Sequence, residues 1–294
     1  SWGEMTIEVT AAQNRAVSFT NKRAGVFYTQ THRNDHPEHA WYRGYNIAGQ
    51  RVFSEMLLSI GGEARDPAAA LAYVTPEALE YRWPDGVKAT FRLFDGVDVI
   101  ALDVAGVPAS ARDSLVLTLA GEPVRADGQT GAIQHYRSQD GDKGTVHHVA
   151  VLRTQHGFLV AIGNTRDAAV KLVREADAKH DTWAKARHRR LTGLFSANHS
   201  IETSDPVLDK ALHWLTHTTD QLVTAQRGQG IYAGLPWFNQ YWGRDTFISF
   251  TGALLVTGQF DTAKEILRSF AKFQDRDPES PFFGRMPNIV LPGA

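Results

Sequence analysis

A change of residue pattern near position 165 constrains the fold of this chain more than any other feature. Up to that point, short runs rich in β-branched and aromatic residues are separated by turn signals such as Pro84-Asp85-Gly86 and Gly141-Asp142. Such a series predicts an antiparallel β-sandwich over residues 1–165, and the lack of alternating strand and helix patterns argues against a parallel sheet. The clearest runs cover residues 7–9, 26–28, 89–94, 115–119 and 158–162.

Beyond residue 165 the pattern becomes helical. Residues 167–190 are charged and rich in alanine, which predicts a surface helix inside a linker over residues 166–203. Ser204-Asp205-Pro206 combines a capping residue with proline, as at the start of a helix. An apolar stripe follows at helical spacing. It consists of Val207, Leu208, Ala211, Leu212, Leu215 and Leu222.

Two more helices are expected after this one. The first covers roughly residues 246–257 and ends at Gly258, a natural C-terminal cap, and the second begins at Phe260. Prolines and glycines interrupt residues 281–294, which predicts an irregular loop. Because three helices enclose little core on their own, residues 204–294 are expected to be an incomplete helical domain. The chain as a whole is predicted to be an α+β multidomain protein.

The charge balance restricts the classes of partner. The 31 basic and 32 acidic residues give a formal net charge of −1, which offers no reason to expect nucleic acid or an anionic membrane as a partner. Neutral ligands such as sugars fit better. The longest mostly apolar stretch, residues 248–256, is too short to span a bilayer. Absence of cysteine excludes thiol chemistry and suits the cytoplasm, without deciding between cytoplasm and periplasm.

Residues 230–247 carry the strongest chemical signal, and most of them belong to a glycine- and aromatic-rich loop expected over residues 227–243. Aromatic side chains crowd a segment that also holds amide, guanidinium and carboxylate groups. Sugars need both, because aromatic rings cover their C–H faces and polar groups bond their hydroxyls. The structural alternative is that Asp245 caps the following helix and that the aromatic rings fill a core. The segment contains Tyr232, Trp237, Phe238, Tyr241 and Trp242, and the polar residues Asn239, Gln240, Arg244 and Asp245.

A run of linked motifs in this part of the chain resembles a known family. Trp242-Gly243-Arg244-Asp245-Thr246-Phe247-Ile248, followed by residues 254–267, is similar to the amylo-α-1,6-glucosidase domain of glycogen debranching enzymes. Residues 233–238 upstream and Gly284-Arg285-Met286-Pro287-Asn288 downstream resemble the same domain, so the similarity covers roughly residues 228–292. It implies the wider superfamily of six-hairpin glycosidases with more certainty than the exact substrate.

This resemblance implies a fold and an activity. The family has an N-terminal β-sandwich followed by an (α/α)6 toroid, which agrees with the two residue patterns. The implied activity is that of an inverting α-glucosidase releasing glucose from α-1,6 branch stubs of glycogen or limit dextrin, without a metal or other cofactor. The implied substrate-binding residues are Arg244 and Asp245 for hydroxyls in the −1 subsite, Trp242, Trp237 and Tyr241 for its aromatic wall, and Asn239 in the same segment.

The catalytic groups are expected to be missing. Inverting glycosidases need a carboxylic acid and a carboxylate about 6.5–9.5 Å apart. In six-hairpin glycosidases both lie on later loops, which would fall beyond Ala294, so no catalytic residue is expected in this chain and it should be inactive alone. It would be a fragment, or one part of a split enzyme whose remaining toroid could be a second polypeptide. Asp245 as the general acid is a lesser alternative, since an arginine-paired aspartate is a poor proton donor.

Two other functions stay open. One is a different six-hairpin α-glycosidase, acting on trehalose or isomalto-oligosaccharides, and the other is a non-catalytic glycan-binding fragment that uses the β-sandwich. Metal binding is not expected. Pro37 prevents a regular helical spacing of His32, His36 and His39. His213 and His217 fall on one helix face, but no third ligand is evident near them.

Overall fold

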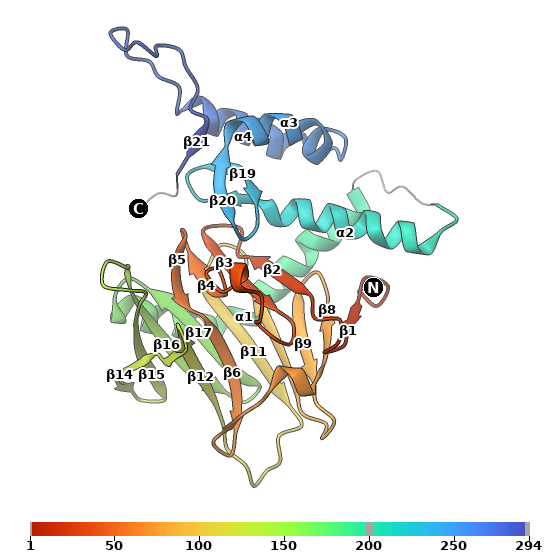
Figure 1. The fold of residues 1–294 in the computed structure, drawn as a ribbon, viewed down its shortest axis with the longest axis vertical. Coiled ribbons are helices and arrows are strands. Elements are labelled where there is room, and N and C mark those ends of the chain that lie inside the picture. Colours follow the sequence, from red (N-terminus) through yellow and green to blue (C-terminus); the bar gives the residue numbers. More distant parts are fainter. Residues whose placement is uncertain (1, 198–202, 292–294) are drawn as a thin grey trace. The chain divides into compact units, whose positions relative to one another are not determined.

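The computed structural model describes residues 2–197 and 203–291. Part of the predicted linker, residues 198–202, and the end of the predicted loop, residues 292–294, lie outside the described residues. The chain forms two compact units. Residues 2–21 and 25–188 make up the first, called the β unit here, and residues 22–24 with those from Arg189 onward make up the second, the helical unit. A large antiparallel β region followed by helices makes the chain an α+β protein (Figure 1).

A nine-stranded antiparallel sheet lies at the centre of the β unit (Figure 1). Most neighbouring strands are also neighbours in the sequence, because hairpins build the sheet. Long connections separate two neighbouring pairs, β1 from β8 and β11 from β17. In order across the sheet the strands are β1 (Ile7–Val9), β8 (Leu71–Val74), β9 (Ala78–Arg82), β10 (Lys88–Leu93), β11 (Val99–Ala105), β17 (Gly157–Gly163), β16 (Val146–Thr154), β15 (Ile133–Gln139) and β14 (Arg125–Thr130).

Two four-stranded sheets complete the β unit, together with two short 3-10 helices. Phe27 of β3 stacks on Phe91 of β10 with ring centroids 4.0 Å apart, so the sheet that contains β3 packs against the nine-stranded sheet. One sheet consists of β2 (Ala16–Thr20), β3 (Gly25–Gln30), β4 (Gly44–Ile47) and β5 (Gln50–Phe53), the other of β13 (Glu122–Pro123), β12 (Asp113–Leu119), β6 (Glu55–Ile60) and β7 (Glu63–Ala64), and the 3-10 helices are η1 (Pro37–His39) and η2 (Pro67–Ala69).

The first part of α1 (Arg166–Ala197) covers the opposite face of the nine-stranded sheet. Small apolar residues at helical spacing on α1 form one buried cluster with strand residues of a single pleat face. Because both faces of β11 and β17 are covered, these strands are apolar along most of their length instead of alternating. The cluster includes Ala169, Val170, Val173 and Ala176 of α1 and Val99, Ala101, Ala150, Leu159 and Ala161 of the sheet.

The helical unit contains helices and a small antiparallel sheet. Asp205 caps its first complete helix by accepting hydrogen bonds from the backbone N–H groups of Val207 and Leu208, as the sequence predicted. Gly258, with a φ of +70°, ends the next helical segment, which is also as predicted. The elements are α2 (Pro206–Leu222), β18 (Val223–Ala225), β19 (Gln229–Gly234), β20 (Phe238–Trp242), α3 (Gly243–Phe250) with the π-helical turn η3 (Thr251–Leu255), α4 (Phe260–Ala271) and β21 (Ile289–Val290).

The structure corrects three expectations for this unit. The segment of residues 227–243, expected as a loop, contains the hairpin strands β19 and β20, because Tyr232 and Tyr241 pair across it. The irregular segment after residue 281 contributes β21, which pairs with β20. The helix expected over residues 246–257 begins earlier, at Gly243, and its last part is π-helical.

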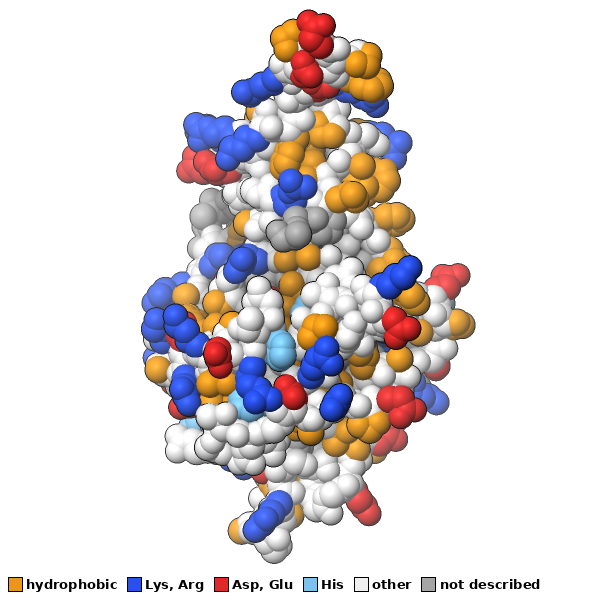
Figure 2. All heavy atoms as spheres, turned by 90° about the vertical axis from the view of Figure 1, so that its left-hand side faces the viewer, with side chains coloured by type: hydrophobic (Ala, Val, Ile, Leu, Met, Phe, Trp, Pro, Cys, Tyr) orange, Lys and Arg blue, Asp and Glu red, His pale blue; other side chains and the backbone are white. Residues whose placement is uncertain are grey.

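The burial of α2 is inverted with respect to its residue types. In a surface helix the apolar stripe ordinarily faces the core. Here Val207 is 75% exposed and Leu215 is 64% exposed, whereas His217, Asp220 and Gln221 are buried. Figure 2 shows that hydrophobic side chains gather on the surface of the helical unit. Val207, Leu208 and Leu215 therefore form an exposed part of the apolar stripe that the described residues leave uncovered, whereas Leu212 and Leu222 are half-buried.

Asp220 is the centre of an ion-pair network within the helical unit. Its carboxylate oxygens each lie 2.8 Å from Nη1 of Arg190, and one of them lies 3.1 Å from Nζ of Lys22. Burial alone would raise the pKa of Asp220, but the positive charges of Lys22 and Arg190 outweigh it and hold that pKa below its usual value. The network joins the end of α1, the segment 22–24 and α2.

No helix among the described residues is long and apolar enough to cross a membrane.

Replacing Asp220 by asparagine should destabilise the chain, because two cations would lose their buried carboxylate. We expect the free energy of unfolding to fall by about 3 kcal/mol in urea titrations at neutral pH. The pKa of Asp220 is lower in the folded chain than in the unfolded chain, where it is about 3.9. The ionised carboxylate therefore stabilises the fold above that pH, and this stabilisation is lost as the pH falls toward the folded-state pKa. The loss of stability between about pH 5 and pH 3 should therefore be smaller in the variant. Asp261→Asn, at a fully exposed carboxylate, is the matched control.

Removing the cap of α2 should have a smaller effect. Asp205→Ala leaves two backbone N–H groups without their acceptor and should lower the free energy of unfolding by about 1 kcal/mol. Ser204→Ala, one residue earlier, should change stability little. Equal losses in the two variants, measured by urea unfolding, would contradict the capping role.

Candidate functional site

The strands β19, β20 and β21 position the segment that the sequence singled out. β20 is the central strand of the three: Tyr241 pairs with Tyr232 on one side, and Trp242 pairs with Ile289 on the other. The backbone N–H of Gly243 donates to the carbonyl of Asn288 over 2.8 Å. The start of α3 therefore brings together two motifs that lie about 40 residues apart in the sequence, Trp-Gly-Arg-Asp at residues 242–245 and Gly-Arg-Met-Pro-Asn at residues 284–288.

Close packing of the downstream motif against the start of α3 requires glycine at position 243. A Cβ atom at this position would lie 2.9 Å from the carbonyl oxygen of Pro287, closer than side-chain carbon atoms approach a backbone oxygen. Any other residue would push the downstream segment away from β20 and α3. The glycine in the Trp-Gly-Arg-Asp run thus has a packing function, which the sequence alone did not reveal.

Arg244 and Asp245 occupy the first turn of α3. Nε of Arg244 lies 3.8 Å from Oδ2 of Asp245, and the two side chains are 69% and 40% exposed. Trp242 is the N-cap residue of α3 and no side chain caps this helix, so the alternative role of Asp245 as a cap is not observed. Both charged groups consequently keep most of their hydrogen-bonding capacity at the surface of the helical unit.

The pleat of β20 separates the remaining predicted site residues into two groups. Asn239 and Tyr241 are buried, whereas Phe238, Gln240 and Trp242 alternate with them and are more exposed. Trp237, 39% exposed, precedes the strand. Five residue steps separate it from Trp242, so their backbones are about 16 Å apart along an extended strand.

Tyr241 has a structural role in this arrangement. Its hydroxyl donates to the carbonyl of Thr224 over 2.8 Å and accepts from the backbone N–H of Gln226 over 2.8 Å. Its ring lies so close to Gly230 that a Cβ there would be 2.5 Å away. Burial raises the pKa of the phenol. With 1% of its surface exposed, Tyr241 does not fit its expected place in an aromatic wall, because no ligand can reach the ring.

Two polar atoms beside the ion pair have no hydrogen-bond partner among the described residues. They are Nε1 of Trp242 and Oγ1 of Thr246, both buried. Buried polar groups are almost always bonded to protein, water or ligand. Thr246 was not among the predicted site residues, since a single threonine in a helix carries no chemical signal by itself.

The histidines considered for metal binding do not form a common site. His36 and His39 stack with ring centroids 4.1 Å apart, while His32 is buried and bonds through Nε2 to the carbonyl of Ala70. Within residues 2–197 and 203–291, no group of three or more His, Asp or Glu side chains is arranged to hold a metal ion.

The comparison with known families covers the first of the two motifs that meet at α3, the Trp-Gly-Arg-Asp run. Residues 175–279 match the family model described as Amylo-alpha-1,6-glucosidase. A glycogen debranching enzyme of Saccharomyces cerevisiae is 41% identical over 71 residues, which is 20% of this chain and 5% of the yeast protein. The match thus spans only a small fraction of that relative.

These matches support a similarity to a glucosidase family, and the similarity lies in the helical part of the chain. The resemblance to the amylo-α-1,6-glucosidase domain of glycogen debranching enzymes is therefore confirmed, and the family segment lies in residues 175–279.

Proposed function

We propose that this chain supplies the −1 subsite of an inverting α-glucosidase that releases glucose from α-1,6 branch stubs of glycogen or limit dextrin. The observation that carries this proposal is the exposed Arg244–Asp245 pair at the start of α3, where two motifs of the matched family meet. The yeast relative is a glycogen debranching enzyme. The substrate of that protein is extended to this chain as part of the proposal.

The chemistry of the pair suits a neutral sugar. A carboxylate accepts hydrogen bonds from hydroxyl groups and a guanidinium donates to them, so the pair can bind two neighbouring hydroxyls of one ring. Because the charges of Arg244 and Asp245 cancel, the pair favours a neutral polyol over an ion. The 3.8 Å separation leaves room for a hydroxyl to bond to both groups.

The aromatic residues are assigned different positions along the ligand. Trp242 adjoins the ion pair and would contact the same ring, whereas Trp237, at the other end of β20, would contact a neighbouring part of the substrate. Tyr241 and Asn239 would act indirectly by holding β20 in place, because both are buried.

The general acid and base are proposed to come from residues outside this chain. The β unit would be the N-terminal β-sandwich of the family, and the helical unit would be the first part of an (α/α)6 toroid. The exposed stripe of α2 supports this assignment, because later helices of a toroid would cover Val207 and Leu215. The remaining part of the toroid could be a second polypeptide.

Two alternative functions have distinct consequences. Another six-hairpin α-glycosidase would release glucose from trehalose or isomalto-oligosaccharides in preference to limit dextrin, which product analysis on a panel of linkages would reveal. A non-catalytic glycan-binding fragment would keep its glycan affinity after deletion of residues 204–294. The position of Arg244 and Asp245 in the helical unit favours the glucosidase.

Replacing Asp245 by asparagine should weaken binding of a glucose-like inhibitor such as deoxynojirimycin. Loss of a charge-assisted hydrogen bond should reduce the affinity by about tenfold to a hundredfold in calorimetric titrations. Asp261→Asn removes an equally charged but fully exposed group from the first turn of α4 and should leave the affinity unchanged. Equal affinity of Asp245→Asn and the unchanged chain would remove the ion pair from the proposed subsite.

The chain alone should bind such an inhibitor but release no glucose from a branched dextrin. A debranching enzyme of full length serves as the positive control for the glucose assay. Sustained glucose release by the isolated chain, abolished by a single substitution in it, would show that the catalytic groups are present here.

A further inference from the structure

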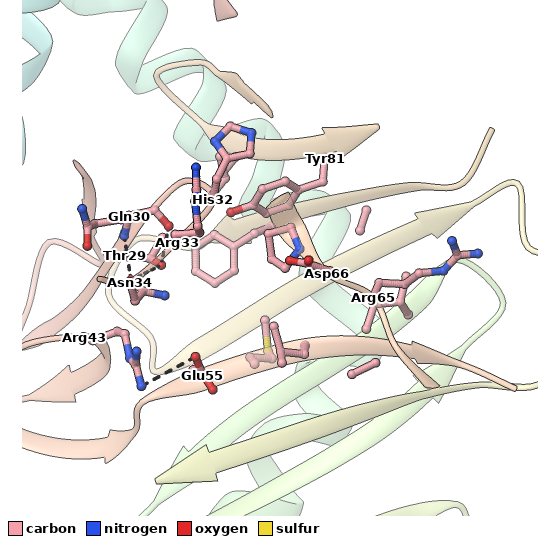
Figure 3. A pocket seen from close by; sticks show the side chains of 18 of the residues that line it. Thr29, Gln30, His32, Arg33, Asn34, Arg43, Glu55, Arg65, Asp66 and Tyr81 are labelled. Atoms are coloured by element: carbon pink, nitrogen blue, oxygen red, sulfur yellow. Dashed lines mark hydrogen bonds and ion pairs between the residues drawn. The ribbon is translucent and has the colours of Figure 1, made fainter. Parts of the chain in front are cut away.

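The β unit contains a cavity that the proposed glucosidase function does not use. Its volume is about 620 Å³, within the range of small-molecule sites. Strands of the nine-stranded sheet line one side, and β3 and β6 line others, as the view in Figure 3 illustrates. All of its lining residues belong to the β unit.

Much of the cavity wall is apolar. The polar atoms of its larger rings already have partners: the hydroxyl of Tyr81 donates to the carbonyl of Thr31 over 2.6 Å, and Nε1 of Trp83 donates to the carbonyl of Asp66 over 2.9 Å. These groups therefore offer mainly ring and hydrocarbon surface to a ligand. The apolar wall includes Phe27, Met56, Leu57, Leu58, Tyr81 and Phe91.

Arg43 and Glu55 provide the exception. They lie together at the cavity wall, with Nη2 of Arg43 3.6 Å from Oε1 of Glu55, beyond hydrogen-bonding distance (Figure 3). Nε of Arg43 is buried and has no hydrogen-bond partner among the described residues. The other oxygen of Glu55 accepts from the hydroxyl of Thr118 over 3.0 Å, which leaves acceptor capacity on the carboxylate. A partly exposed guanidinium and a carboxylate with unfilled acceptor capacity thus lie side by side.

The charge of the cavity restricts the ligand further. Three basic and three acidic residues line it, so their formal charges cancel. Arg65 is paired with Asp85 over 2.6 Å, and Asp66 accepts from the backbone N–H of Ala68. Arg33 and Asp35 are the other charged residues of the wall, and Arg43 and Glu55 differ from them in forming an ion pair with each other. An anion would be attracted by Arg43 but repelled by Glu55. A neutral ligand with neighbouring hydroxyls satisfies both groups.

We propose that this cavity is a second carbohydrate site, which binds a short neutral oligosaccharide with its hydroxyl edge on Arg43 and Glu55 and its C–H face on the apolar wall. The site is separate from Arg244 and Asp245, so it does not depend on the glucosidase proposal. It would hold glucan without hydrolysing it.

The three methionines of the chain allow a direct test. Met56 lines the cavity, Met286 lies in the downstream motif of the helical unit, and Met5 is buried in the β unit outside the cavity. In a chain with methyl-labelled methionine, maltotriose should shift the Met56 signal in a saturable way and leave the Met5 signal unchanged. Arg43→Gln should weaken this response at least about tenfold, since it removes a charge-assisted donor.

Control variants separate the two proposed sites and test for misfolding. Arg244→Gln should leave the Met56 response unchanged, and Arg153→Gln, which breaks the ion pair with Asp113 outside the cavity, should do the same. Ala64→Trp narrows the cavity from its wall without removing a charged group and should also abolish the response. Unchanged urea unfolding of each variant verifies its fold.

Three results would overturn the proposal. They are a Met56 signal that millimolar maltotriose does not move in the unchanged chain, an equal response in Arg43→Gln, and displacement of maltotriose by octanoate. Octanoate has an apolar body and a carboxylate, so its displacement of the sugar would assign the cavity to an anionic amphiphile.

Discussion

The backbone pairing of β20 determines where the candidate sugar-binding groups lie. This strand is held on both sides, by β19 and by β21, and the chain enters α3 directly from its end. The pleat of β20 turns Tyr241 inward, and α3 begins directly after Trp242. Arg244 and Asp245 therefore lie at the surface, where they pair with each other over 3.8 Å. The hydrogen bond from Gly243 to Asn288 fixes this geometry from the downstream side. The site thus depends on main-chain interactions that Arg244 and Asp245 do not themselves make.

The inverted burial of α2 gives the helical unit its character. A buried carboxylate costs free energy unless positive charges and hydrogen bonds compensate, and Lys22 and Arg190 do so for Asp220. The side of α2 that carries Asp220 therefore packs against the rest of the helical unit through ion pairs. The side that carries Val207 and Leu215 is exposed. An ion-pair network that spans three chain segments also defines their mutual orientation more narrowly than apolar contacts would, since charged groups tolerate few geometries.

The nine-stranded sheet serves two purposes in the β unit. On its α1 face, small and branched side chains of the sheet form a buried apolar cluster with residues of α1. Its other face packs through Phe27 and Phe91 near β3 but leaves a cavity toward β6. A sheet that is rigid because α1 covers one face is well suited to hold a binding cavity on the other.

Local sequence signals were sufficient for features that depend on neighbouring residues. Asp205 followed by Pro206 marks the start of α2, Gly258 marks the end of a helix, and the alternation of turn residues with β-branched runs separates a strand-rich part from a helical part. Residues 175–279 matched the family that the Trp-Gly-Arg-Asp run resembled. Each of these signals is local, because caps, turns and motifs act over a few residues.

Tertiary structure decided everything that depends on distant partners. The segment that ends at Trp242 is a strand because it pairs with β19 on one side and, through Tyr241 and Trp242, with the distant β21 on the other. Tyr241 is buried with its hydroxyl donating to the carbonyl of Thr224 and accepting from the backbone N–H of Gln226, although its residue type equally suits a sugar-binding wall. The stripe on α2 has the spacing of a buried helix face, yet Asp220 finds its cations on the opposite side. Sequence alone determined where the strand-rich part gives way to helices and where α2 begins, because these signals are local. Long-range pairing and charge compensation decided which segments become strands in the helical unit and which side of each element faces outward.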